Sequence, residues 1–570
     1  MTNDNINFIG LECKHTLHIP TIPGVRDDYH MVKEIIHFKD GKKKPNIRMI
    51  KDFKRPFYIT KPHYQNHKDK KEMEYLSKVN KYESTESNLA NNIAIRLGMV
   101  GYSKNSMRDV RDSPFLYGTE TSSSTILKKM YQLKWPDLHT ENTMAALDIE
   151  TDIEDDSKIT IMTVSMPDKV FTVATLDYLK PLRKSKADIE KELWETWDYA
   201  VPDTELKRGV TEKTFKVAKN ELDMIIMIFE EIHKWKPDFL AAHNVDYEIT
   251  NIVKVIEREG LRPEDIFSDP DIPKELRTFK YYKGRKSRVT EKGVEFKFDP
   301  QDVWNIATVT ASYHWIDTMS AYNYIRANQG KIPGGYGLDN LLKHNGITGK
   351  LFKDMSDKFL RNSADWHIDM SNNHKIKYMV YNQYDTFAMH ELENKTKDIA
   401  ISINVLAGSS DYRVFNSGPK RLVDNMHFYY LENDRVLGVK PKELDNDKVL
   451  GLDQWIVTLQ TFRIRSIGLK LVKEYPELAT NIRGMVTDLD AVSSYPSNII
   501  AANVSKQTTR KEIISIKGKT KEVFMAPNLE IFAGPASAGN FVTTMLGFPE
   551  QRELLKRVKK KYIERQGKKE

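Results

Sequence analysis

Between residues 145 and 405 the sequence alternates short apolar runs with segments of helical periodicity. One segment, 221–234, places apolar residues three and four positions apart, which predicts an amphipathic helix. Strand-like runs separated by helices are typical of a sheet flanked by helices, so we expect an α/β domain that ends near Val405. Two further alternating stretches within 279–298, on either side of 291–293, predict a β-hairpin inside this domain.

The regions that flank this domain are mixed in character. Residues 1–125 combine alternating runs, such as 55–60, with lysine-rich turns and end in a serine/threonine cluster at 121–125. They predict an α+β domain followed by a linker. Residues 406–480 show helix-like and irregular patterns. We expect them to form a connecting segment that packs on the N-terminal domain. At about 100–200 residues per domain, a chain of 570 residues has room for three or four domains.

Composition excludes several classes of protein. Hydrophobic residues form 40% of the chain, which is enough apolar material for folded cores. The single cysteine, Cys13, rules out a disulfide framework and a cysteine-based zinc cluster. The sequence contains neither a leader-like start nor an apolar run of the roughly 20 residues that a membrane span needs. A cytoplasmic location without membrane partners is expected.

The charge balance permits a polyanionic partner. Lysine and arginine number 88 against 80 aspartate and glutamate residues, a modest excess. Much of this excess lies in residues 548–570, and an amphipathic helix is predicted over 548–566. A strand is predicted over 485–490.

Two carboxylates, Asp148 and Glu150, lie two residues apart in the strand-like run 145–151. Alternate residues of a strand project from the same face, so both side chains can share a metal ion. Alone, this pair carries little information, because Asp246 and Glu248 have the same spacing and most such pairs are solvated charges. Companion motifs are needed before a metal site is favoured.

Two later segments supply such companions. An apolar run ends in His243 and Asn244, and an acidic residue, Glu248, follows. Farther along, Tyr381 stands four residues before Asp385, on one face of a predicted helix. Together with the acid pair, these segments resemble the three exonuclease motifs of DnaQ-like 3′–5′ proofreading exonucleases, in the version fused to family B DNA polymerases.

This resemblance implies an RNase H-like domain at residues 126–405 that hydrolyses phosphodiesters with two Mg²⁺ or Mn²⁺ ions. Carboxylates hold two such ions about 3.5–4 Å apart, and hard oxygen ligands favour these metals. Tyr381 is expected to orient the attacking water through its hydroxyl, and Asn244 to contact the DNA. The expected catalytic carboxylates and metal ligands are Asp148, Glu150, Glu248 and Asp385.

The second motif departs from the family at its acidic position, where the family has aspartate and this chain has Glu248, which is one methylene longer. Three alternatives follow: Glu248 reaches the ion, Asp246 replaces it, or the site is weakened. Glu248 is the preferred ligand. His243 and Asn244 also fit a turn that merely caps the following helix, a role compatible with the functional one.

Residues 490–497, Asp-Ala-Val-Ser-Ser-Tyr-Pro-Ser, resemble the first carboxylate motif of a family B polymerase palm. The resemblance implies that Asp490 is a catalytic metal ligand and that Ser493, Ser494 and Tyr495 bind the incoming nucleotide. Ser494 stands where leucine is usual, which puts fidelity in question. An ordinary strand and turn is the alternative, but the place behind three exonuclease motifs favours the palm.

A basic helix is predicted after this motif. Arg552 and Lys556 lie four residues apart on one face, as in the fingers helices of this family that grip the triphosphate. A solvated basic face is the common alternative. The fingers motif and the second palm carboxylate motif of the family do not occur in the sequence, so this chain alone is not expected to extend a primer.

The resemblance runs from about residue 55 onward, with a motif order similar to that of replicative polymerases of T-even-type bacteriophages. Arg288, in the predicted hairpin, and Lys350 stand where such enzymes contact DNA. The implied segments are an N-terminal domain (1–125), the exonuclease (126–405), the connecting segment (406–480), a first palm segment (481–547) and the start of a fingers helix (548–570).

The expected protein is an N-terminal subunit or fragment of a split or truncated phage-type family B DNA polymerase, acting in the cytoplasm of an infected host. Its implied partners are primer–template and single-stranded DNA, deoxynucleoside triphosphate, a sliding clamp, and a second chain with the remaining fingers, palm and thumb. Two alternatives are a stand-alone single-strand 3′–5′ exonuclease and a non-catalytic DNA-binding polymerase subunit. Metal-dependent trimming without a partner favours the first; salt-sensitive DNA binding without cleavage favours the second.

Overall fold

The computed structural model describes residues 7–68, 70–99, 106–152, 158–289, 293, 295–356, 363–402, 418–439, 510–516 and 519–525. The chain forms two compact units, residues 1–442 and 443–570, and each is described by itself. The predicted strand at 485–490 and the predicted helix at 548–566 lie outside the described residues. Of the helices in the described ranges, none combines the length and the apolar character that crossing a membrane requires.

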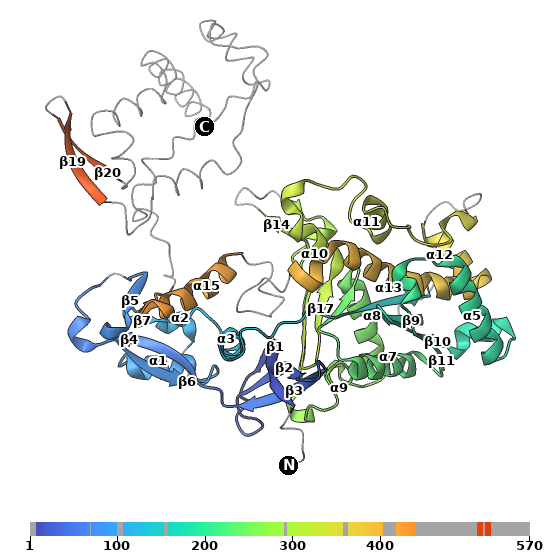
Figure 1. The fold of residues 1–570 in the computed structure, drawn as a ribbon, viewed down its shortest axis with the longest axis horizontal. Coiled ribbons are helices and arrows are strands. Elements are labelled where there is room, and N and C mark those ends of the chain that lie inside the picture. Colours follow the sequence, from blue (N-terminus) through green and yellow to red (C-terminus); the bar gives the residue numbers. More distant parts are fainter. Residues whose placement is uncertain are drawn as a thin grey trace, which may run out of the picture. The chain divides into compact units, whose positions relative to one another are not determined.

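A six-stranded mixed sheet forms the centre of the α/β region (Figure 1). From one edge to the other, its strands are β11 (Glu212–Ala218), β10 (Lys169–Thr175), β9 (Ile159–Met166), β8 (Met144–Thr151), β12 (Phe239–Ala242) and β17 (His314–Asp317). β8 pairs antiparallel with β9 and parallel with β12, which in turn pairs parallel with β17. β10 is antiparallel to β9 and parallel to β11. The α/β prediction for this region is confirmed, and β8 is an interior strand.

Helices cover both faces of this sheet (Figure 1). On one face lie α13 (Lys375–Thr396) and α5 (Lys186–Ala200), and on the other lie α7 (Glu221–Trp235) and α8 (Val245–Arg258). α7 confirms the helix predicted at 221–234. Because both faces of the sheet are covered, its strands are apolar on both sides and bury two separate cores.

The side chains of strand β8 alternate between these two cores. Ala146 packs on the α13 side, whereas Leu147 and Ile149 pack on the α7 side. Burying one large apolar side chain contributes about 1.5–3 kcal/mol, so the alternation holds the strand in this register. Because alternate residues share a face, Asp148 and Glu150 lie on the same side as Ala146, toward α13.

The N-terminal residues form two small antiparallel sheets. One contains β1 (Phe8–Ile19), β2 (Tyr29–Phe38) and β3 (Lys43–Lys51), and the other contains β6 (Val79–Ser84), β4 (Arg55–Thr60) and β7 (Leu116–Tyr117). β4 confirms the strand-like run at 55–60. Helices α1 (Leu89–Arg96) and α2 (Met107–Val110) accompany the second sheet in the chain, so this part mixes helices and strands as expected.

The linker predicted at residues 121–125 is wrong. Ser122 is the N-cap of helix α3 (Ser123–Lys134), and its hydroxyl accepts a hydrogen bond from the Thr125 amide at 3.3 Å. Serine and threonine side chains satisfy free amides at a helix start as well as in turns, so one cluster fits both structures.

The hairpin predicted within 279–298 is partly confirmed. β14 (Ser287–Val289) and β15 (Glu295–Lys297) pair antiparallel around 291–293. The first alternating stretch instead forms β13 (Phe279–Tyr282), which pairs with β16 (Ile306–Val309). Gly284 lies between the two pairings, at a position where a Cβ would lie 2.7 Å from the Trp304 carbonyl oxygen.

A buried ion pair joins the N-terminal sheet to the α/β region. Lys33 Nζ lies 2.7 Å from Asp238 Oδ1 and donates to the carbonyls of Lys236 and Pro237, at 2.8 and 2.7 Å. The other oxygen of Asp238 accepts from the amide and the hydroxyl of Thr143. Both charged groups are thus surrounded by partners, as burial of charge requires.

Further elements are described in both units. β18 (Arg435–Leu437) follows α15 (Gly418–Glu432) and pairs antiparallel with β5 (Met73–Tyr75). In the unit 443–570, β19 (Arg510–Ile516) and β20 (Lys519–Met525) pair antiparallel. The other α-helices are α4 (Leu176–Leu179), α6 (Glu205–Arg208), α9 (Pro263–Phe267), α10 (Thr318–Ile325), α11 (Leu338–His344) and α12 (Ser363–Asn373).

Candidate metal centre

Three carboxylates converge where α13 crosses β8. One oxygen each of Asp148, Glu150 and Asp385 lies within 4.8 Å of the others. Glu150 and Asp385 are buried, and Asp148 is partly exposed. The predicted placement of Asp148 and Glu150 on one strand face is confirmed, and so is the placement of Tyr381 and Asp385 on one helix. A strand and a helix far apart in the sequence therefore build one acidic cluster.

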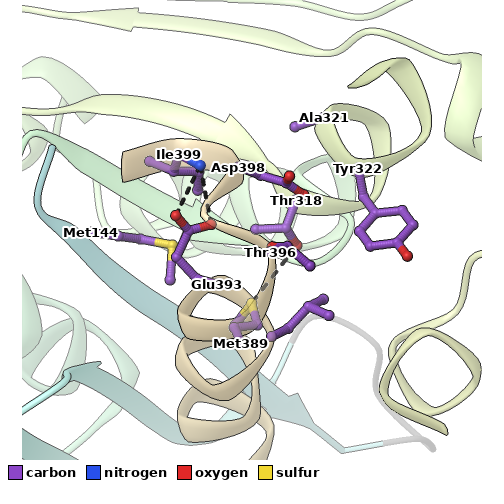
Figure 2. A pocket seen from close by; sticks show the side chains of 10 residues that line it. Met144, Thr318, Ala321, Tyr322, Met389, Glu393, Thr396, Asp398 and Ile399 are labelled. Atoms are coloured by element: carbon purple, nitrogen blue, oxygen red, sulfur yellow. Dashed lines mark hydrogen bonds between the residues drawn. The ribbon is translucent and has the colours of Figure 1, made fainter. Parts of the chain in front are cut away.

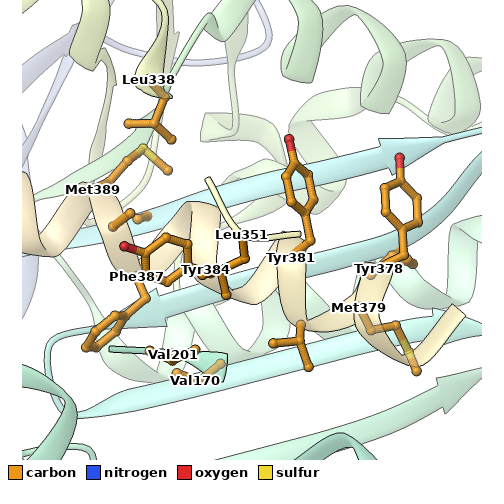
Figure 3. Close-up of a cluster of buried hydrophobic side chains, with 14 of the residues drawn as sticks. Val170, Val201, Leu338, Leu351, Tyr378, Met379, Tyr381, Tyr384, Phe387 and Met389 are labelled. Atoms are coloured by element: carbon orange, nitrogen blue, oxygen red, sulfur yellow. The ribbon is translucent and has the colours of Figure 1, made fainter. Parts of the chain in front are cut away.

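Helix α13 also holds the two carboxylates of β8 by hydrogen bonds. Asn382 Nδ2 donates to Asp148 Oδ2 at 2.6 Å, and the Tyr378 hydroxyl donates to Glu150 Oε2. Figure 3 shows Tyr378 and Tyr381 projecting from the same side of α13. We did not predict Tyr378 or Asn382, although their spacing of seven and three residues from Asp385 is the signal that places them on its helix face.

Glu248 is not one of the three acids whose oxygens lie within 4.8 Å, but it is close enough to feel the charges of Asp148 and Glu150. Glu248 is buried in the first turn of α8, where burial, and then the charges of Asp148 and Glu150, raise its pKa well above the usual value. Asp246 accepts from the Tyr281 hydroxyl at 2.6 Å and pairs with a lysine of the hairpin base at 3.2 Å. Of the two acids in this motif, Glu248 is the one that faces the cluster.

The electrostatics of the cluster oppose full ionisation. Burial raises the pKa of Asp148, Glu150 and Asp385, and that of Glu150 reaches about 8 although the Tyr378 hydrogen bond opposes the rise. For Asp148 the neighbouring carboxylates add to the effect of burial. Buried carboxylates without enough positive charge retain protons, and a bound cation would replace those protons.

The donor set suits a hard divalent cation. Within the described part of the chain, Asp385 Oδ1 and Glu248 Oε2 are buried without a hydrogen-bond partner. Each therefore has lone pairs available beside other carboxylate oxygens. Mg²⁺ and Mn²⁺ prefer such all-oxygen sites, so Asp148, Glu150, Asp385 and Glu248 fit ions of this kind.

Lys350 is partly exposed, and its ammonium group contacts the cluster. Its Nζ lies 2.5 Å from Asp385 Oδ2 and donates to the Tyr381 hydroxyl oxygen at 2.8 Å. Burial opposes the charge, but Asp385 and Tyr381 raise the pKa of Lys350 well above its usual value. Its backbone amide donates to Asp339 Oδ1 at 2.7 Å, and Gly349 permits this approach because a Cβ there would lie 2.3 Å from the same oxygen.

The second motif forms a tight turn at the start of α8. His243 donates through Nε2 to the Tyr336 carbonyl at 2.9 Å, and burial lowers its pKa to about 4, so the ring is neutral. Asn244 is exposed with φ at +90°, a left-handed conformation that asparagine tolerates better than most residues. Asp317, which we did not predict, is the N-cap of α10 and also accepts from the Val245 amide at the start of α8, at 3.1 Å. Its position at the end of a strand is the sequence signal that could have identified it.

The other predicted nucleic-acid contacts have different placements. Arg288 is exposed on β14, and its guanidinium lies 5.8 Å from the ring centre of Phe296. The predicted polymerase residues lie outside the described residues: Asp490, Ser493, Ser494, Tyr495, Arg552 and Lys556.

A pocket lies at the other end of α13, around Glu393 (Figure 2). Eight residues of helix separate Glu393 from Asp385, which is about 12 Å. The Glu393 carboxylate accepts from the backbone amides of Ile399 and Ala400 at 2.9 and 2.8 Å. Asp398, also in the lining, pairs with Arg326 at 2.7 Å. The acidic groups of this pocket are therefore paired, whereas the carboxylate cluster keeps two buried oxygens, Asp385 Oδ1 and Glu248 Oε2, without a hydrogen-bond partner among the described residues.

No family model matches this chain, and no curated protein matches it. Function is therefore inferred from the spacing of the motifs and from the geometry of the carboxylate cluster.

Proposed function

We propose that residues 126–405 form an RNase H-like 3′–5′ exonuclease domain that hydrolyses the terminal phosphodiester of a DNA strand with two Mg²⁺ or Mn²⁺ ions. The observation that carries this proposal is the convergence of Asp148, Glu150 and Asp385 on one point between β8 and α13. Several carboxylates at one point are what two-metal phosphodiester hydrolysis requires.

The strand order supports the RNase H-like assignment. If the edge strand β11 is set aside and the strands are numbered along the chain from β8, the sheet runs 3-2-1-4-5 from β10 to β17. The first three strands are antiparallel and the last two run parallel to the first. This is the order of RNase H-like folds, in which acidic residues of the first strand belong to the active site.

Each residue of the cluster has a distinct role in this proposal. Asp148, Glu150 and Asp385 hold the ions, and Glu248 adds a fourth carboxylate from α8. When bound, the ions activate a water and stabilise the charge on the leaving oxygen. Lys350 donates to the Tyr381 oxygen and so fixes the hydroxyl beside Asp385, where it can orient a water or a phosphate oxygen.

For the chain as a whole, we propose a subunit or fragment of a phage-type family B DNA-directed DNA polymerase, with the exonuclease proofreading during replication. The support is the order of the motifs, in which the Asp490 segment follows three exonuclease motifs. Primer extension that appears only on addition of a polypeptide with the remaining fingers, palm and thumb would support this. A mixture that never extends a primer would contradict it.

The first experiment concerns the exonuclease itself. Purified chain is incubated with a 5′-labelled single strand, with Mg²⁺, with Mn²⁺ and with EDTA, beside the double variant Asp148→Ala/Glu150→Ala. We expect a metal-dependent ladder of shortened strands that a 3′-terminal phosphorothioate linkage blocks. Absence of shortening under both metals, or a ladder that persists in the double variant, would refute the proposal.

A further inference from the structure

We infer that Tyr378 and His367 are positioning residues that hold Glu150 in its metal-binding orientation, His367 acting through Tyr378. This inference rests on the proposed metal-dependent function, because it concerns how one of its ligands is oriented. It assigns a positioning role to two further side chains, one from α12 and one from α13.

The first step is the hydrogen-bond chain. The Tyr378 hydroxyl donates to Glu150 Oε2, and His367 Nδ1 lies 2.8 Å from the same hydroxyl but 3.8 Å from Glu150 Oε2, too far for a direct hydrogen bond. A phenol has one proton, and here that proton is directed to the carboxylate. His367 must therefore donate its Nδ1 proton to the Tyr378 oxygen, which selects one neutral tautomer of the imidazole.

The second step is the packing that prevents the rings from turning away. The rings of Tyr378 and Tyr381 stack at 5.8 Å with an angle of 14° between their planes. His367 contacts both rings edge to face, and the neighbouring Trp366 lies 5.0 Å from Tyr381. Two adjacent residues of α12 thus clamp the two tyrosines of α13 from one side.

The third step concerns how the hydrogen bond orients the Glu150 carboxylate for metal binding. A buried carboxylate with one oxygen held by a donor presents its remaining lone pairs in a fixed direction. Loss of groups that orient metal ligands typically weakens metal binding by 10–100-fold. The side chain of His367 is 24% exposed, so the chain of hydrogen bonds runs from the protein surface to the ligand.

The test measures Mn²⁺ affinity by calorimetry or by electron paramagnetic resonance, with no DNA present. Tyr378→Phe keeps the stacked ring and removes only the hydroxyl, so we expect about 10–100-fold weaker Mn²⁺ binding. His367→Phe should weaken it several-fold, and His367→Asn, whose amide can replace the Nδ1 donor, should recover part of the loss. Tyr313→Phe is the matched control, since its buried hydroxyl donates to the Phe267 carbonyl at 2.9 Å in the other core.

The outcomes separate this inference from the proposed function. Wild-type protein that binds Mn²⁺ more tightly than Tyr378→Phe but never shortens DNA would refute the exonuclease and leave the positioning role intact. Equal Mn²⁺ affinity in wild type and Tyr378→Phe would overturn the positioning role whether or not DNA is cleaved. Equal weakening in Tyr313→Phe would also overturn it, because the effect would then be general to buried tyrosine hydroxyls. Wild-type protein that binds no Mn²⁺ would overturn both.

Discussion

Two lysine–aspartate pairs, Lys33–Asp238 and Lys350–Asp385, each have a buried aspartate, and they differ in what surrounds them. Lys33 and Asp238, between the N-terminal sheet and the α/β region, form hydrogen bonds with four further groups: two carbonyls, one amide and one hydroxyl. Although burial opposes ionisation, Lys33 holds the pKa of Asp238 below its usual value. Lys350 and Asp385 sit instead among further carboxylates, and burial raises the pKa of Asp385 despite the lysine.

The difference separates a structural ion pair from a site that lacks positive charge. In the first pair each charge has a matching charge and hydrogen bonds, so nothing further is needed. In the second, Lys350 faces four acids, with Lys353 as a further positive charge near Glu150 and Asp385, and two of the buried carboxylate oxygens have no hydrogen-bond partner among the described residues. A divalent cation is the addition that would balance the second region.

The largest expected effect comes from removing each lysine in turn. Lys33→Met should lower the free energy of unfolding by about 3–5 kcal/mol, because it leaves Asp238 buried and unpaired. Lys350→Met should also destabilise the metal-free protein, but Mn²⁺ should restore its stability because the ion replaces the lost charge. Thermal unfolding with and without Mn²⁺ checks both. If Mn²⁺ also restored the stability of Lys33→Met, the proposed difference between the two pairs would be contradicted.

Removing one carboxylate should separate activity from stability. Asp148→Asn should lower exonuclease activity by on the order of 10²–10³-fold, the scale for losing a catalytic electrostatic group. The same change should raise the melting temperature of the metal-free protein, since it relieves repulsion among buried carboxylates. Asp238→Asn is the matched control and should lower the melting temperature. A fall in melting temperature for both variants would contradict the comparison.

The pH dependence of metal-free stability should reveal the excess of negative charge. Burial raises the pKa of Glu150 from 4.5 to about 8, so the folded protein keeps a proton that the unfolded chain has lost. Stability should therefore fall as pH rises from about 4.5 to about 8, at about 1.4 kcal/mol per pKa unit at most. Unfolding measured across this range should show a shallower slope in Glu150→Gln and with saturating Mn²⁺. Equal slopes in all three samples would argue against this assignment.

The smallest effect should come from the acid that points away. Glu248→Gln should lower activity by about 10²-fold, whereas Asp246→Asn, a matched loss of one carboxylate two residues away, should change it by no more than roughly threefold. Asp246→Asn weakens hydrogen bonds to Tyr281, worth about 0.5–1.5 kcal/mol of stability. Cleavage of a single strand by both variants gives the comparison. The reverse order would make Asp246 the ligand.

Several features could be predicted from the sequence because they are local. The two-residue spacing of Asp148 and Glu150 places them on one face of any strand, and the four-residue spacing of Tyr381 and Asp385 places them on one face of any helix. The helix at 221–234 likewise follows from its own periodicity.

Other features could not be predicted because two structures satisfy the same local chemistry. The serine/threonine cluster at 121–125 caps α3, although capping and turn formation use the same side-chain groups. β13 satisfies the alternation expected of a hairpin strand but pairs with β16, since alternation identifies a strand and not its partner. The choice between Asp246 and Glu248 could not be predicted for the same reason, because both are acids in the first turn of one helix.

The sequence by itself determined which residues of a strand or helix share a face, because backbone geometry gives each element a fixed period. Only the tertiary structure decided that Asn382 meets Asp148, 234 residues away, and that Lys350 lies among the carboxylates. Such meetings depend on how α13 packs across β8, and packing is set by the shapes of both apolar faces together. The periodicity of neither segment alone specifies how the two pack together.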